Sequence, residues 1–228
     1  MKPADDPGTD YCQLVRRGYD ACAASYDAAR RADAEPALSW ITCRLEPGAR
    51  VLDLGCGAGV PVTRQLAQAY RVLGVDLSPE MIARARAHVP MASFVCADAM
   101  DLDLEAESLD AVVSFYAVFH IPRERHRELF ERIYGWLAPG GSFLATLAQR
   151  DEPAYTEEDF FGVTMYWSNY GLSRYLAMLR STGFEIAHTG ELGHGYGAEH
   201  ETPAEHHPVV LAVKPACDPS RCSQGIAY

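Results

Sequence analysis

Residues 51–59 read Val51-Leu52-Asp53-Leu54-Gly55-Cys56-Gly57-Ala58-Gly59, an apolar run that passes directly into three closely spaced glycines. The apolar part is short and bounded by turn residues, which predicts a buried strand. Gly55, Gly57 and Gly59 allow a backbone loop to pass tightly against a ligand, where any Cβ would collide. A dinucleotide-binding loop needs its third glycine at position 60, which is Val60 here.

A carboxylate precedes these glycines, because Asp53 belongs to the predicted strand. It would repel a pyrophosphate and attract a ligand that carries an ammonium or sulfonium charge. Together with Val60, this argues against a nicotinamide oxidoreductase. The simpler alternative is a glycine-rich turn between a strand and a helix that binds no ligand.

Strand-like and helix-like segments alternate on both sides of this loop. Such alternation with near-continuous apolar strands predicts a parallel sheet covered by helices on both faces, with ligands bound beyond the carboxyl ends of the strands. No helix separates the last two strands, so we expect them to pair antiparallel. The expected helices are 11–31, 36–44, 59–69, 79–88, 123–138 and 171–182, and the expected strands are 50–54, 71–75, 93–96, 110–115, 142–147, 184–190 and 207–214.

Composition and net charge argue against two classes of binding partner, nucleic acids and anionic membranes. The 228 residues are 48% hydrophobic and 22% charged, as in an ordinary globular protein, and the formal net charge is −11. Such an acidic chain favours neither nucleic acid nor an anionic membrane surface. The seven cysteines are scattered without a C-x-x-C pair, and the first residues do not read as a signal peptide. We therefore expect a cytoplasmic protein.

The glycine-rich loop resembles the D-x-G-x-G-x-G loop of class I S-adenosylmethionine (SAM)-dependent methyltransferases, in the small-molecule, type 11-like branch. The resemblance covers roughly residues 12–190. It implies an α/β fold with one Rossmann-like, doubly wound sheet of seven mostly parallel strands, the last antiparallel, plus an N-terminal helical cap and a lid insert after the fifth strand. It also implies SAM as cofactor, released as S-adenosylhomocysteine.

The same resemblance assigns the cofactor contacts. The loop would hold the methionine half, Asp76 the ribose hydroxyls, and Asp98 with the N–H of Ala99 the adenine. Leu77 and Met81 are candidates for stacking on the adenine or for plain core. A solvated acid in an acid-rich loop is the alternative for Asp98. The full predicted set is Tyr26, Asp53, Gly55, Cys56, Gly57, Gly59, Asp76, Leu77, Met81, Asp98, Ala99, Ser114 and Phe115.

The residues that would contact the methyl acceptor are predicted from their positions in the sequence. Tyr116 and His120 follow the fourth strand of the expected sheet and are the candidate catalytic residues. His120 is the candidate general base because imidazole titrates near neutral pH, and Tyr116 is also a candidate wall of the acceptor site. A histidine that caps the next helix is the alternative. Tyr19 is a candidate acceptor contact. It lies seven residues before Tyr26 on the same helix face, an arrangement that core packing alone would also explain.

The aromatic stretch 149–170 breaks the strand–helix rhythm, and we interpret it as a lid over a flat or apolar acceptor, as in natural-product tailoring enzymes. Its candidate acceptor contacts are Met165, Trp167 and Ser168. A dimer contact is the competing interpretation. The loop 193–207 is rich in His and Glu, but its spacing follows no familiar ligand pattern, so we predict no metal site.

These expectations define one methyltransferase domain over residues 1–228. Its predicted parts are a helical cap (11–45), a SAM-binding core (46–148), the lid (149–170), the rest of the sheet (171–215) and a tail (216–228). We expect a monomer or homodimer that methylates a small molecule at a hydroxyl or carboxyl oxygen. Transfer to nitrogen, sulfur or carbon, and a SAM-binding module without turnover, are the alternatives.

Overall fold

The computed structural model describes residues 2–3, 10–30, 35–192 and 207–216. Its centre is a sheet that, among these residues, has seven strands. The strands are β2 (Arg50–Leu54), β3 (Arg71–Asp76), β4 (Ser93–Cys96), β5 (Leu109–Ser114), β6 (Leu137–Thr146), β9 (Glu185–Leu192) and β10 (His207–Val213). Their spatial order is β4-β3-β2-β5-β6-β10-β9.

Strand direction confirms the predicted fold class. β2 pairs in parallel with β3 and β5, β3 with β4, and β5 with β6. β10 pairs antiparallel with both β6 and β9, so the last strand is the one that runs against the rest. The parallel strands therefore end at one edge of the sheet, where the loops that carry the candidate site residues meet.

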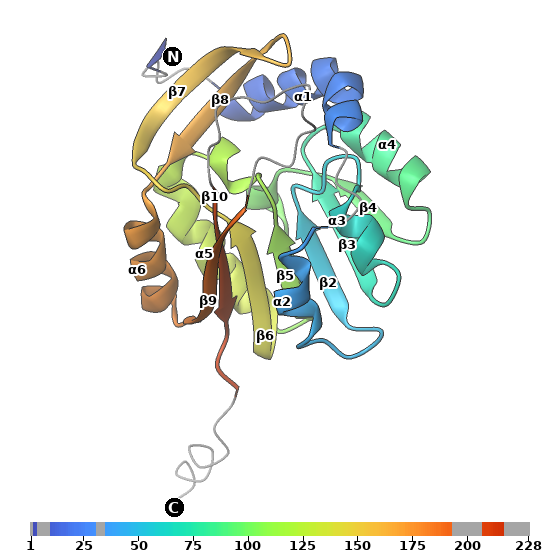
Figure 1. Ribbon diagram of the computed structural model, residues 1–228, viewed down its shortest axis with the longest axis vertical. Helices are drawn as coiled ribbons and strands as arrows, with labels where there is room; N and C mark the ends of the chain where they lie inside the picture. Colours follow the sequence, from blue (N-terminus) through green and yellow to red (C-terminus); the bar gives the residue numbers. More distant parts are fainter. Residues whose placement is uncertain (1, 4–9, 31–34, 193–206, 217–228) are drawn as a thin grey trace, which may run out of the picture.

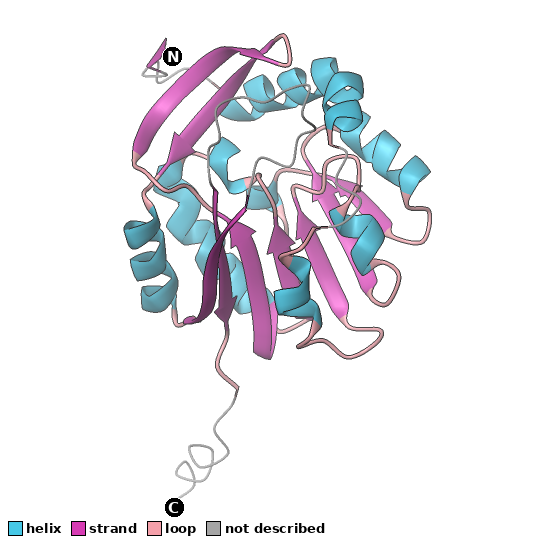
Figure 2. Ribbon diagram, viewed as in Figure 1, coloured by secondary structure: helices cyan, strands magenta, loops and turns pink. Residues whose placement is uncertain are grey.

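Helices cover both faces of the sheet (Figure 2). On one face, α5 and α6 bury Phe130 and Tyr175 against β-strand residues that include Leu52. On the other, α2 and α3 bury Ile41 and Leu66. The helices are α2 (Leu38–Thr42), α3 (Val62–Leu66), α4 (Pro79–His88), α5 (His126–Trp136) and α6 (Leu172–Thr182).

A second layer lies across the carboxyl ends of the strands. It consists of helix α1 (Tyr11–Ala29) and a three-stranded sheet of β1 (Lys2–Pro3), β7 (Glu152–Phe160) and β8 (Val163–Asn169). Figure 1 shows this roof above the main sheet. Roof and sheet meet in a small core of their own, in which Val15 and Tyr26 of α1 pack with Met81 and Met165.

The stretch 149–170, which we expected to be an irregular lid, is a β-hairpin. Aromatic residues lie on both of its strands, with Tyr155 opposite Trp167 and Tyr166 opposite Thr156. Phe161 and Gly162 form its turn with φ of 52° and 79°, and such a turn needs positive φ at both positions. Asn-Gly or Asp-Gly usually marks this turn, and phenylalanine in the first position hides it from sequence inspection.

The largest departures from the predicted bounds are in α3 and β6. α3 spans only Val62–Leu66 of the expected 59–69, because Gly59 and Pro61 keep its first residues in a loop. β6 begins at Leu137 rather than 142, so the predicted Pro-Gly-Gly turn lies inside the strand bounds. By contrast, α4 begins and ends where predicted, with Ser78 as its N-cap.

Two further predictions concern segments that lie almost entirely outside the described residues. The His- and Glu-rich loop lies outside the described residues, apart from His207, and so does nearly all of the predicted tail. Within the described residues, no helix combines the length and apolar character that crossing a membrane requires.

Candidate active site

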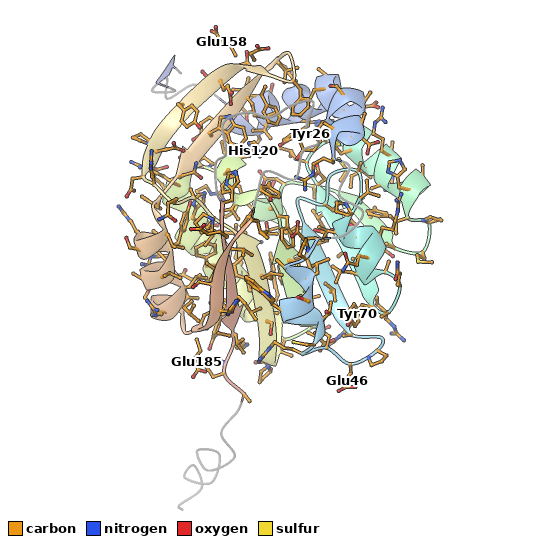
Figure 3. All side chains as sticks on the ribbon, in the orientation of Figure 1. Tyr26, Glu46, Tyr70, His120, Glu158 and Glu185 are labelled. Atoms are coloured by element: carbon orange, nitrogen blue, oxygen red, sulfur yellow. The ribbon has the colours of Figure 1, made fainter. Side chains whose placement is uncertain are left out.

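One cavity opens where the parallel strands end beneath the roof. Figure 3 places Tyr26 and His120 at this end of the molecule, whereas Glu46, Tyr70 and Glu185 lie at the opposite end. Most of the predicted site residues line the cavity. These are Tyr19, Tyr26, Gly55, Gly57, Asp76, Leu77, Met81, Asp98, Ala99, Phe115, Tyr116 and His120.

The glycine loop follows β2 and forms the cavity floor. Gly55 has φ of 75°, and a Cβ there would collide with the Cβ of Ala117, so the loop passes directly against the segment after β5. Gly57 has φ of 52°, and a Cβ there would meet no atom within 4 Å. The loop is therefore packed tightly on one side and leaves open space on the cavity side.

Asp76 ends β3 and holds this loop in place. Its Oδ2 accepts a hydrogen bond from the Gly57 N–H at 2.8 Å, and its Oδ1 accepts one from the Ser78 N–H at 2.9 Å. Burial raises the pKa of this carboxyl, while the two N–H donors oppose the shift. Each oxygen keeps a lone pair for a hydroxyl group of a ligand.

Asp98 follows β4 and caps a short 3₁₀ helix, since its Oδ1 accepts from the Met100 N–H at 2.8 Å. Its Oδ2 accepts from the thiol of Cys12 on α1 at 2.8 Å. Burial raises the pKa of Cys12 to about 11, so the thiol keeps its proton and acts as a donor. Sequence reasoning missed this contact, because the two residues are 86 positions apart.

Several predicted cofactor residues lie behind the cavity wall. Asp53 is 2% exposed and accepts a hydrogen bond from the Thr63 hydroxyl at 2.5 Å. Burial raises its pKa to about 7. The Ser114 hydroxyl donates to the Leu54 carbonyl. Cys56 is buried, and Gly59 packs against α4, so these positions shape the loop from beneath.

His120 and Tyr19 meet across the cavity. The Tyr19 hydroxyl lies 2.7 Å from His120 Nε2, and the Tyr166 carbonyl oxygen lies 2.8 Å from Nδ1. Since a carbonyl only accepts, Nδ1 carries the imidazole proton and Nε2 accepts the hydrogen of Tyr19. Burial lowers the pKa of His120 to about 4, so the ring is neutral at physiological pH. The His120 imidazole therefore accepts a hydrogen bond from Tyr19 and does not cap the next helix.

Tyr116 is held in an unusual backbone conformation, with φ of 58°. Its N–H donates to the Thr146 hydroxyl at 2.6 Å, which helps to offset the strain. The guanidinium of Arg30, at the end of α1, lies 4.7 Å from the centroid of the Tyr116 ring. Arg30 also opposes the raised pKa of Asp53, so it brings positive charge to this end of the cavity.

The three predicted contacts from the lid lie outside the cavity wall. Met165 is fully buried, and its methyl group would lie 2.9 Å from a Cβ at Gly18, so it packs against α1. Ser168 accepts from the backbone N–H of Arg123 at 3.1 Å. Trp167 packs on the His120 ring, with centroids 4.5 Å apart. The hairpin thus supports the cavity wall, and these side chains do not form its surface.

Two acids of α1, also missed in the sequence, fasten that helix to α4. The Ser78 hydroxyl donates to Asp20 Oδ1 at 2.6 Å, and Asp27 pairs with Arg84 at 3.2 Å. Asp20 and Asp27 each follow one of the cavity tyrosines, so one helix face lines the cavity and the adjoining face docks on α4. The repeated Tyr-Asp pair in the sequence was the available signal.

The described residues suit a nucleoside that carries a positive charge. Open space above Gly57, the carboxylate of Asp76 beside it and the buried Asp53 behind it together favour hydroxyl groups and a cation. No cluster of His, Cys, Asp and Glu among the described residues could hold a metal ion.

Comparison with known proteins identifies the domain. The family model described as a methyltransferase domain matches residues 51–141, which run from β2 through the glycine loop into β6. Residues 51–141 carry the core of a SAM-dependent methyltransferase domain. This methyltransferase domain is also similar to curated enzymes, although the chain spans less than half of their length.

Phosphoethanolamine N-methyltransferase 3 of Arabidopsis thaliana is 33% identical over 150 residues, which cover 62% of this chain and 30% of the plant enzyme. The ubiquinone biosynthesis O-methyltransferase of Xanthomonas axonopodis pv. citri is 37% identical over 118 residues, 48% of each chain. The two relatives methylate different kinds of atom, so likeness to them leaves the acceptor atom of this methyltransferase open.

The fold extends beyond the matched residues. The Burkholderia thailandensis 1,6-didemethyltoxoflavin-N1-methyltransferase, solved with its substrate and S-adenosylhomocysteine, aligns with a TM-score of 0.67. The alignment covers 93% of this chain and 94% of that one at 23% identity. At this level of identity the likeness concerns the fold of the methyltransferase alone.

Proposed function

We propose that this protein transfers the methyl group of SAM to a hydroxyl oxygen of a small-molecule acceptor. The Tyr19–His120 pair carries the proposal, since a neutral imidazole that accepts from a phenol at 2.7 Å can receive a proton at the cavity surface. A carboxylate acceptor has no proton to remove and would leave this pair idle. We also propose that residues 1–228 act as one cytoplasmic domain without a nucleic-acid partner.

In the proposed complex, Asp76 binds the ribose hydroxyls and Asp98 the adenine amine, while Asp53 favours the ammonium group through the loop. The loop 55–59 then lies against the methionine half. SAM supplies a methyl group on a sulfonium, which is already activated for displacement. The task of the protein is therefore to orient the acceptor in line with that methyl group and to exclude water.

The acceptor oxygen forms a bond to the methyl carbon as the carbon–sulfur bond breaks, and the bonding pair stays on sulfur. The acceptor hydroxyl becomes strongly acidic as this bond forms. Its proton can then pass to the Tyr19 oxygen while the Tyr19 proton passes to His120 Nε2. An imidazole with a low pKa is sufficient for this transfer, because the proton leaves an oxonium-like oxygen.

The test combines SAM-binding calorimetry with a panel of phenols, aliphatic alcohols, carboxylic acids and amines, in which methylated product and S-adenosylhomocysteine are measured by mass spectrometry. We expect SAM to bind and phenols or alcohols to gain a methyl group. Transfer to amines alone would refute the hydroxyl acceptor. Binding without S-adenosylhomocysteine formation from any acceptor would favour the module without turnover.

A further inference from the structure

A buried polar chain lies behind the cavity and takes no part in the proposed chemistry. His126, the first residue of α5, is fully buried, and so is Tyr175 of α6. The Tyr175 hydroxyl lies 2.9 Å from His126 Nδ1, and the Ile121 carbonyl oxygen lies 2.9 Å from His126 Nε2. The backbone N–H of Tyr170 donates to the Tyr175 oxygen at 3.1 Å.

Each proton in this chain has one consistent position. The Ile121 carbonyl only accepts, so Nε2 of His126 carries the imidazole proton and Nδ1 accepts the hydrogen of Tyr175. The Tyr175 oxygen then accepts from Tyr170. Each donor and acceptor in this series of hydrogen bonds has a partner, so loss of one side chain leaves a buried polar group without its partner.

This series of hydrogen bonds ends at Ile121, the residue that follows His120. Ile121 lines the cavity, and its carbonyl is the group that His126 holds. From the other side, strand β8 contacts the same segment, through the Tyr166 carbonyl on His120 and the Ser168 hydroxyl on the N–H of Arg123. Residues 120–123 are thus fastened between α5 and β8.

We propose that His126 and Tyr175 are positioning residues, which hold the segment after His120 so that Nε2 faces the Tyr19 hydroxyl. This proposal rests on the proposed function for the role of His120. An apolar pair of the same size could fill the space between α5 and α6. It could not direct the Ile121 carbonyl, which a hydrogen-bonded chain does.

The surroundings of both imidazoles determine how this can be measured. Tyr19 of α1 faces His120 directly, and the Tyr166 carbonyl and the Trp167 ring face it from β8. Burial lowers the pKa of His120 to about 4. If the segment loosens and admits water, that pKa should rise toward the ordinary value near 6.5.

His126 meets Tyr175 from α6, Tyr170 before it, and the charges of Glu124 and Arg123 in the preceding turn. Its own pKa is also lowered to about 4 by burial. The two imidazoles must therefore be assigned separately, which NMR of selectively labelled histidine with single His→Gln reference variants achieves.

The experiment compares Tyr175→Phe with Tyr134→Phe by NMR titration of the His120 ring without SAM or acceptor. Tyr134 lies on α5 and packs on Phe184, away from Ile121, so it controls for the loss of a phenol hydroxyl in the same helix layer. In Tyr175→Phe we expect the pKa of His120 to move from about 4 toward 6.5. We also expect methyl transfer to fall about tenfold in kcat with an unchanged KM for SAM.

An unchanged His120 titration in Tyr175→Phe, equal to that of Tyr134→Phe, overturns the proposal. Should Tyr175→Phe fail to fold, His126→Gln, which keeps an amide donor, undergoes the same comparison, and the same two outcomes support or overturn the proposal. The titration needs no turnover, so failure of the wild-type protein to methylate any acceptor would refute the proposed function and leave this result intact.

Discussion

The hydroxyl of Tyr19 lies 2.7 Å from Nε2 of His120, across a chain separation of 101 residues. α1 supplies the phenol, and the segment after β5 supplies the imidazole. The main sheet and its roof must therefore dock correctly before this pair exists. The proposed proton transfer in the cavity therefore depends on correct docking of α1.

Tyr19→Phe should lower kcat for methyl transfer by about 10²-fold, the scale of a lost proton-transfer group. The ring remains, so its packing on Tyr26 and Phe160 should persist, and SAM affinity should change little. Steady-state kinetics and calorimetry measure the two effects. Tyr70→Phe is the control, since Tyr70 lies at the opposite end of the molecule (Figure 3). Full turnover in Tyr19→Phe would exclude a role of this hydroxyl in proton transfer.

Asp53→Asn should stabilise the protein at alkaline pH. Burial raises the pKa of Asp53 to about 7 in the fold, against 3.8 as the ordinary value. The folded state therefore holds a proton between pH 3.8 and 7 that the unfolded state has lost, and stability falls as pH rises through this window. Asparagine removes that penalty, which is on the order of 4 kcal/mol at most. Urea unfolding should show the two proteins diverging from about pH 4 to about pH 7 and differing by a constant amount at higher pH.

The same substitution should weaken SAM binding, because the carboxylate favours the ammonium group of the ligand. Binding to the wild type near neutral pH should also release a proton, which calorimetry in buffers of different ionisation enthalpy detects. Asp53→Asn should release none. If proton release persists in Asp53→Asn, another group is titrating and the assignment of Asp53 is wrong.

Asp20→Ala should loosen α1 from the cofactor side of the cavity. Asp20 accepts hydrogen bonds from the Ser78 hydroxyl at 2.6 Å and from the Glu80 N–H at 3.4 Å. We expect faster amide hydrogen exchange along α1 and a SAM dissociation constant about tenfold higher, the scale of one charge-assisted hydrogen bond. Arg17→Ala is the control on the same helix, because Arg17 is exposed and its guanidinium donates a hydrogen bond to Gln13 within α1. Equal exchange in both variants would contradict the proposed role of Asp20.

Gly55→Ala should destabilise the fold by about 3 kcal/mol, through a Cβ that collides with Ala117 and a positive φ that alanine disfavours. Gly48→Ala separates the two causes. Gly48 has φ of 83°, and an alanine Cβ there would have no atom within 4 Å. It should therefore lose only the backbone part, about 1 kcal/mol. Urea midpoints measure both variants. Equal losses would mean that Ala117 moves aside and that the loop tolerates a side chain at Gly55.

Local sequence determined the central part of this protein. Arg50–Leu54, Pro79–His88 and Ser93–Cys96 have the predicted bounds, because apolar runs, turn residues and the Ser78-Pro79 cap act over a few neighbouring residues. Gly55, Gly57, Asp76 and Asp98 could be placed at one edge for the same reason, since parallel strands end together.

Tertiary structure alone decided the rest. The bonds of Tyr19 to His120 and of Cys12 to Asp98 join residues about a hundred positions apart, and no local pattern encodes such a pairing. The hairpin of β7 and β8 depends on a turn whose usual asparagine is replaced by Phe161. Packing against α1 selects its structure, and it supports His120 through a backbone carbonyl, a group that every residue carries and that sequence inspection cannot single out.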